Sequence, residues 1–203
     1  MICFPDRKAT MRSNNSALDL ALVAVFAALL AALSLTPAIP VGALGVPITL
    51  QALGVMIIGL VLGPWRGAAA VLLYLAVGFA GLPVFANGGA GIGMFGKPSI
   101  GYLLSFPLAA FVIGYLSRLF VRTNRRPEGV WLFVAALAGV VVNHLFGIIG
   151  MSLVAHIDLI KAAGIDVVYL PGDVAKAVVA AAVAVVVHKA FPLLLARPVA
   201  LQR

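Results

Sequence analysis

The sequence has few charged residues and a single cysteine. Only 10% of its 203 residues are charged, and six of these are acidic. Soluble domains carry about 25% charged residues, so this composition excludes an ordinary water-soluble domain. The one cysteine, Cys3, lies in a polar N-terminal segment, which leaves no disulfide framework and no thiolate metal site.

Apolar residues, by contrast, make up 64% of the chain, and no charge occurs from Leu20 to Trp65. A helix needs about 20 apolar residues to cross a bilayer. The chain therefore has room for six such helices with short connections, and none for a separate soluble domain. We predict an all-α integral membrane protein in which one bundle of six transmembrane helices lies in the lipid bilayer.

Proline, glycine and charged residues separate the apolar runs and set the expected boundaries. Residues 1–17 are expected to form a polar, basic tail, residues 18–195 the transmembrane substrate-binding domain, and residues 196–203 a short basic tail. The first apolar run is too long for a signal peptide, so we expect an uncleaved first helix. The predicted helices are Leu18–Thr36, Ile48–Gly63, Ala68–Ala80, Ile100–Phe120, Val130–Ala155 and Asp173–Leu195.

The distribution of basic residues predicts the orientation. Eleven lysines and arginines lie in the two terminal segments, at the Arg66 turn and in the cluster from Arg118 to Arg126, and three lie in the alternate loops. Cytoplasmic loops carry the excess of basic residues, so both termini are predicted to be cytoplasmic. The same distribution explains the net charge of +8 without a nucleic-acid partner.

Asp173 and Lys176 interrupt the last predicted helix. Asp173 follows Pro171-Gly172 and is a favourable helix N-cap, and the three-residue spacing places Lys176 on the same helix face. A charge inside a bilayer costs about 2.5–3.5 kcal/mol and usually lines a cavity. The pair is thus a candidate binding site, and the alternative is a helix cap beside a lysine that snorkels to the interface.

A glycine-rich loop from Gly81 to Gly101 is predicted on the same outer side as this pair. It places Asn87, Gly88 and Gly89 after Phe85, and such a loop brings backbone donors near a ligand. Two nucleotide motifs match here by letter only. No strand precedes the glycines, and Pro98 stands where a phosphate loop needs a hydroxyl.

Other polar residues are predicted near this outer end. Thr49, Gln51 and Tyr102 open helices there, and together with the loop and the charged pair they indicate an outward-facing small-molecule site. His144, in mid-helix beside Asn143, is interpreted as an ordinary packed residue. No metal site is expected, because the remaining candidate ligands have no recognised spacing; these are His156, Asp158, Asp166 and Asp173.

Alanines recur every four residues on the first predicted helix, at Ala24, Ala28 and Ala32. A face of small residues lets another helix approach closely in lipid. The alternatives left open are packing within the chain and docking of a partner protein.

Four blocks, in this order, carry a resemblance to a known family. The sequence resembles the BioY family, the biotin-specific S components of energy-coupling factor (ECF) transporters. The blocks are Pro47-Ile48-Thr49-Leu50-Gln51 with Gly63-Pro64, then Gly81-Leu82-Pro83-Val84-Phe85-Ala86, then Gly101-Tyr102-Leu103-Leu104 with Phe106-Pro107, and Leu170-Pro171-Gly172-Asp173 with Lys176-Ala177.

The resemblance implies a bundle in the plasma membrane that captures biotin from outside the cell. It also implies partners, namely a transmembrane T component that docks on Ala24 and Ala28, and paired cytoplasmic ABC-type ATPases. The ligand residues of the family map onto Asn87, Asp173 and Lys176, with Gln51 and Tyr102 beside them. Many relatives carry glycine where this chain has Asn87, and the segment around His144 departs from the family, so no function is carried onto that histidine.

The chemistry of biotin agrees with these residues. A carboxylate such as Asp173 can accept a ureido N–H, and Lys176 or Asn87 can donate to the ureido oxygen or to the ligand carboxylate. Phe85, Met94 and Phe95 are candidates to cover the bicyclic ring. The alternatives are an S component for thiamine or riboflavin, or a solitary biotin facilitator. An intramembrane enzyme is disfavoured because no paired acidic cluster lies within the spans.

Overall fold

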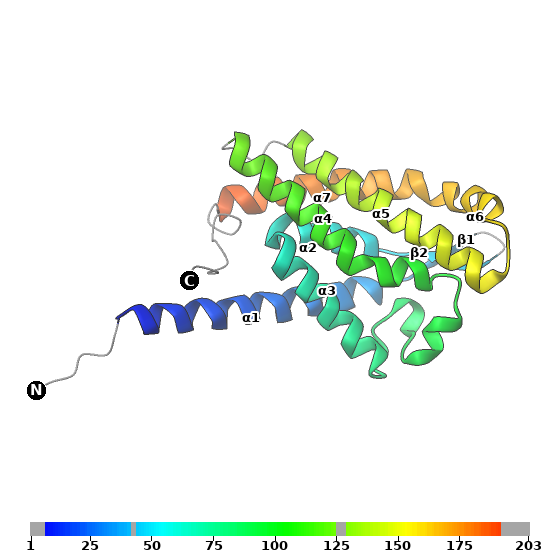
Figure 1. Ribbon diagram of the computed structural model, residues 1–203, viewed down its shortest axis with the longest axis horizontal. Helices are drawn as coiled ribbons and strands as arrows, with labels where there is room; N and C mark the ends of the chain where they lie inside the picture. Colours follow the sequence, from blue (N-terminus) through cyan, green and yellow to red (C-terminus); the bar gives the residue numbers. More distant parts are fainter. Residues whose placement is uncertain (1–6, 42–43, 125–128, 192–203) are drawn as a thin grey trace, which may run out of the picture.

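The structure is a computed structural model that describes residues 7–41, 44–124 and 129–191 (Figure 1). The C-terminal tail at 196–203, Cys3, and the arginines Arg125 and Arg126 lie outside the described residues. The α-helices are α1 (Arg7–Ser34), α2 (Gln51–Leu62), α3 (Pro64–Phe79), α4 (Ile100–Asn124), α5 (Gly129–Ala155), α6 (Leu159–Asp166) and α7 (Leu170–Ala190).

Six apolar helical segments in the described part of the chain form the bundle, as predicted. Four are long and apolar enough to cross a membrane, namely Ser16–Ser34, Ile100–Val121, Gly129–Ala155 and Leu159–Ala190, and α2 and α3 are shorter. The last of the four joins α6, a 3-10 turn (Val167–Tyr169) and α7 into one continuous segment. The predicted all-α membrane fold is confirmed.

α1 begins at Arg7 and not at the predicted Leu18. Two other helix starts differ from the prediction for one shared reason. α3 begins at Pro64, and α7 begins at Leu170 with Pro171 in its first turn. Both prolines were interpreted as breaks. However, the backbone N–H groups of the first helical turn have no intrahelical partner, so proline fits there although it lacks an N–H. The prediction that Asp173 caps α7 is therefore wrong. It lies inside the first turn, and no side chain caps this helix.

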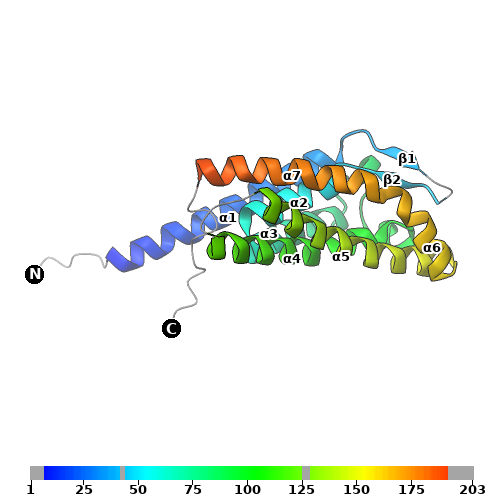
Figure 2. The same ribbon diagram turned by 90° about the horizontal axis from the view of Figure 1, so that it is seen from above.

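The helices pack lengthwise, with α4 against α5, α2 between α4 and α7, and α1 against α3 (Figures 1 and 2). α4 and α5 contact each other closely at Gly101. A Cβ built at Gly101 would lie 2.1 Å from the backbone oxygen of Phe146 and 2.9 Å from the Cα of Gly150. Glycine at both positions lets the two backbones touch, which fixes Tyr102 next to α5. The start of α1 and the end of α7 point toward the same end of the molecule (Figure 1).

A short antiparallel hairpin, which the sequence did not predict, covers the opposite end of the bundle. It consists of β1 (Ile39–Val41) and β2 (Val46–Ile48), with Pro40 paired to Pro47. Proline suits such an edge because it has no N–H to leave unpaired. The hydroxyl of Tyr169 donates to the carbonyl oxygens of Val41 and Val46, at 3.2 and 3.1 Å. This residue therefore ties the hairpin to the start of α7.

The glycine-rich loop contains two 3-10 turns, Ala86–Gly88 and Ile92–Gly96, and its apolar side chains anchor it to the bundle. Phe85 is fully buried, with its ring 5.4 Å from Tyr74 and 5.2 Å from Phe79, and Met94 is also buried. Asn87 is exposed in a left-handed backbone conformation, with φ +56°. The loop thus has a fixed inner side and an exposed tip.

Candidate functional site

A cavity lies between the hairpin, the glycine-rich loop and the adjoining ends of α2, α4 and α7, and contains about 660 Å³ of empty space, including the part that is open to the outside. Its walls combine apolar residues with a few polar groups. They are Val46, Pro47, Ile48, Thr49, Gln51, Ala52, Phe85, Ala86, Met94, Ser99, Tyr102, Leu103, Phe106, Asn143, Tyr169, Asp173 and Lys176.

The structure brings most of the predicted site residues to this cavity. Gln51, Phe85, Tyr102, Asp173 and Lys176 all lie in its walls, although they come from four different segments of the chain. The three remaining predicted residues belong to the loop tip, next to the wall residue Ala86, and are not among the cavity-lining residues; they are Asn87, Gly88 and Gly89. Phe95 stacks on Phe79 and is likewise not in the wall.

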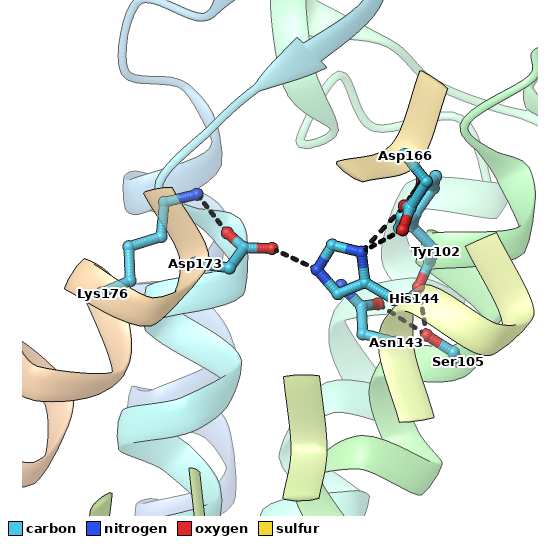
Figure 3. A network of polar contacts seen from close by, with 7 residues as sticks. All are labelled: Tyr102, Ser105, Asn143, His144, Asp166, Asp173 and Lys176. Atoms are coloured by element: carbon cyan, nitrogen blue, oxygen red, sulfur yellow. Dashed lines mark hydrogen bonds and ion pairs between the residues drawn. The ribbon is translucent and has the colours of Figure 1, made fainter. Parts of the chain in front are cut away.

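The charged groups of the site form one connected network of side chains (Figure 3). Lys176 Nζ lies 2.7 Å from Asp173 Oδ1, and Asp173 Oδ2 lies 3.1 Å from His144 Nε2. The other ring nitrogen, His144 Nδ1, lies 2.8 and 2.7 Å from the two oxygens of Asp166. The hydroxyl of Tyr102 donates to Asp166. Four helices, α4 to α7, thus meet through these five side chains.

This network is almost closed to solvent. His144, Asp166 and Asp173 are 5%, 3% and 6% exposed. Burying charged groups inside a membrane protein costs free energy unless they are paired and hydrogen-bonded. Every side chain of this network has such a partner. The arrangement therefore stabilises the charges at the cavity wall and orients Asp173.

Sequence reasoning missed two members of the network. His144 was interpreted as an ordinary packed residue, and Asp166 was considered only as a metal ligand and set aside. One signal was available, because Asp166 and Asp173 are seven residues apart and share one face when the segment is continuously helical. It was overlooked since Pro171 was interpreted as the end of the preceding loop.

Gln51, another residue of the cavity wall, belongs to a second polar cluster. Its amide nitrogen donates to the hydroxyl of Tyr74 at 2.6 Å, and that hydroxyl donates to the carbonyl oxygen of Val84 at 3.0 Å. Ser34, at the end of α1, donates to the same carbonyl oxygen. This cluster attaches the glycine-rich loop to α1, α2 and α3.

Asn143 is a cavity-lining residue that was not predicted as a site residue. Its side-chain oxygen accepts a hydrogen bond from Ser105 at 2.7 Å. This bond directs the amide nitrogen away from Ser105 (Figure 3). Asn143 therefore adds a polar group to the wall beside His144.

The aspartates considered as metal ligands instead form ion pairs. Asp166 and Asp173 pair with His144, whereas Asp158 forms an exposed ion pair with Lys161 at 3.4 Å. Within residues 7–41, 44–124 and 129–191, no three His, Cys, Asp or Glu side chains are grouped to hold a metal ion.

The small-residue face of α1 points away from the bundle. Ala24, Ala28 and Ala32 are exposed, whereas Ala27 and Leu30 on the other side of the helix are buried in the core. Packing within the chain therefore uses the opposite face, and the alanine face is available to another protein or to lipid.

Comparison with known proteins agrees with this architecture. The sequence model of the BioY family matches residues 8–193. The chain belongs to the BioY family. It is 44% identical over 182 residues to the biotin transporter BioY of Rhizobium etli, covering 88% of this chain and 97% of the relative. It is also 44% identical over 176 residues to that of Rhodobacter capsulatus, covering 82% and 90%.

A solved structure shares the fold of this BioY chain. It is the crystal structure of an S-component for biotin from an ECF-type ABC transporter, with a TM-score of 0.81 and 30% identity, covering 87% of this chain and 93% of that one. The resemblance seen in the sequence blocks is confirmed. In space, the blocks ending at Gln51, Ala86, Leu104 and Lys176 all contribute to the walls of the cavity.

Proposed function

We propose that this membrane protein captures biotin in the cavity from outside the cell and functions in biotin uptake. The observation that carries the proposal is the Asp173–Lys176 pair in the cavity wall of a BioY chain, in which Asp173 is buried. A balanced pair of opposite charges does not favour a cationic ligand such as thiamine, but it offers both an acceptor and a donor to a ureido group or a carboxylate.

The polar groups of the cavity match the ends of biotin. The Asp173 carboxylate accepts a ureido N–H, and the Lys176 ammonium donates to the ureido oxygen or to the ligand carboxylate. Met94 and Phe106, both buried in the wall, supply apolar surface for the bicyclic ring. In this proposal Asn87 joins the ligand when the exposed loop tip, with Gly88 and Gly89, folds over the cavity.

The family relationship also supports a role within an ECF transporter. In this proposal the T component docks against Ala24 and Ala28 on the exposed face of α1, and paired cytoplasmic ABC-type ATPases supply the energy. The termini lie on the cytoplasmic side of the cell membrane and the cavity faces outward. Delivery of biotin inward then requires the partners to move this chain relative to the membrane. Uptake by the chain without these partners would identify it instead as a solitary facilitator.

Binding of labelled biotin to the purified chain in detergent, without partners, tests the proposal. We expect one biotin per chain, displaced by unlabelled biotin but not by thiamine or riboflavin. Asp173→Ala should remove binding. Asp158→Ala is the matched control, because Asp158 is an exposed acidic residue outside the cavity, and it should bind as wild type does. Equal affinity of the two variants would contradict the proposed site.

A further inference from the structure

Behind the Asp173–Lys176 pair lies a second charged pair, His144 and Asp166, which the proposed contacts with biotin do not use. Neither residue lines the cavity, and both are buried. They nevertheless connect directly to Asp173 through His144 Nε2 (Figure 3). We infer that the His144–Asp166 pair holds one proton more than a neutral imidazole carries, so that His144 is an imidazolium ion inside the bundle. Both residues then act as positioning residues that fix the Asp173 carboxylate for ligand capture. This inference rests on the proposed function.

The hydrogen-bond donors and acceptors around His144 indicate its protonation state. Carboxylate oxygens face both ring nitrogens of His144, those of Asp166 at Nδ1 and that of Asp173 at Nε2. Ionised carboxylates only accept hydrogen bonds, and a neutral imidazole carries a single N–H. Each ring nitrogen therefore needs its own proton to satisfy its carboxylate. The geometry fits an imidazolium ion.

The charges of this buried site balance only when His144 is protonated. Asp166 and Asp173 bring two negative charges, and Lys176 brings one positive charge. A protonated His144 makes the cluster neutral, and without it one uncompensated charge stays buried within the bundle.

Among the residues that the structure describes, no other group facing His144 alters this balance. α2, α4, α6 and α7 pack against α5. Besides Asp166, Asp173 and Lys176, these helices and the adjoining 3-10 turn direct two titratable residues toward the site, Tyr102 and Tyr169. The Tyr102 hydroxyl donates to Asp166 and the Tyr169 hydroxyl donates to backbone carbonyls, so both remain neutral donors.

The network also fixes the orientation of the Asp173 carboxylate. Lys176 contacts Asp173 Oδ1 and His144 contacts Oδ2, so both oxygens are restrained from two different helices. His144 is itself held by both oxygens of Asp166. Such a supported carboxylate loses little further freedom when it accepts a ligand N–H, which favours affinity. Lys176 alone would leave Asp173 restrained from within its own helix.

Two variants separate positioning from simple stabilisation. His144→Gln removes the imidazolium but leaves Asp166 as a buried carboxylate without a cation, which destabilises the fold. In the double variant His144→Gln with Asp166→Asn, both charges are absent and the amides can pair with each other. We expect its unfolding temperature to recover toward that of wild type. Its biotin affinity should stay about 10- to 100-fold weaker, as for a lost hydrogen bond to a charged group.

His188→Gln is the matched control. His188 is also a buried histidine, and its ring donates to the carbonyl oxygen of Leu60 at 3.0 Å. It lies fifteen residues beyond Asp173 on α7, about 22 Å along the helix. This variant should lose stability but keep the biotin affinity of wild type.

Nitrogen NMR of histidine-labelled protein tests the proton directly. The His144 signals are identified by their absence from the double variant. At neutral pH we expect both ring nitrogens to carry a proton, and a ring with one bare nitrogen would overturn the inference. Recovery of affinity together with stability in the double variant would also overturn it, because His144 would then be only structural.

The two proposals fail in distinguishable ways. If wild-type protein does not bind biotin, the proposed function fails, and the nitrogen signals still decide whether His144 and Asp166 hold a proton. If wild type and the double variant bind biotin equally well, the function stands and the positioning role is removed.

Discussion

His144 Nε2 lies 3.1 Å from Asp173 Oδ2, on the opposite side of the carboxylate from Lys176 Nζ. A residue in the middle of α5 therefore reaches the carboxylate at the start of α7. This contact links two helices that are far apart in sequence. It also couples a charge in the cavity wall to a charge in the interior of the bundle. A substitution that removes one charged partner of Asp173 is therefore expected to change how Asp173 binds the ligand.

Lys176→Met should weaken biotin binding by about 10- to 100-fold, because it removes the charged donor of the pair while retaining the length of the side chain. The substitution also leaves Asp173 with His144 alone. Lys161→Met is the control, since Lys161 is exposed on α6 and pairs only with the exposed Asp158. Equilibrium binding of labelled biotin measures both. Unchanged affinity in Lys176→Met would mean that the ligand does not contact this end of the cavity.

The sequence predicted the bundle well because the length of an apolar run indicates directly whether a helix can cross a bilayer. Its spans, the Asp173–Lys176 pair and the cavity position of Gln51 and Tyr102 all followed from local patterns. The errors arose where long-range contacts override local signals. Pro171 was interpreted as a break, although the segment from Leu159 to Ala190 is continuous, and this hid the shared face of Asp166 and Asp173.

The role of His144 could not be predicted for a different reason. A lone histidine in a helix has no partner within four residues, so its function depends on which helices pack beside it. Here the partners are 22 and 29 residues away, on α6 and α7. The hairpin was missed for the same reason, because its three-residue strands are stabilised by Tyr169, more than a hundred residues later.

Gly101→Ala should destabilise the protein by about 1–3 kcal/mol, the usual cost of overpacking. Its Cβ would lie 2.1 Å from the backbone oxygen of Phe146, so α4 and α5 would have to separate. Gly164→Ala on α6 is the control, because a Cβ there meets nothing within 4 Å. Alanine also favours the helix by up to about 1 kcal/mol. Thermal unfolding in detergent should show a lower unfolding temperature for Gly101→Ala only. Equal transitions would contradict the close contact.

Tyr169→Phe should speed the release of bound biotin about fivefold. The change removes the hydroxyl that donates to Val41 and Val46, a loss of about 1 kcal/mol that loosens the hairpin over the cavity. Tyr115→Phe, at an exposed position on α4, is the control. Dissociation of labelled biotin after dilution measures the effect. Equal release rates from the two variants would show that the hairpin does not restrain the ligand.

Ala28→Trp should abolish biotin uptake in cells while leaving biotin binding intact. Ala28 lies on the exposed face of α1 and does not contact the cavity, so the bulky ring changes only the surface proposed for the T component. Val186→Trp on α7 is the control, because it places the same ring on another exposed apolar position. Three measurements are needed: biotin uptake by cells, biotin binding by the purified chain, and copurification of the T component and the ATPases with this chain. If Ala28→Trp copurifies with its partners as well as the control does, the docking face lies elsewhere. Loss of binding in both variants would instead indicate that a large ring on the outer surface disturbs the bundle itself.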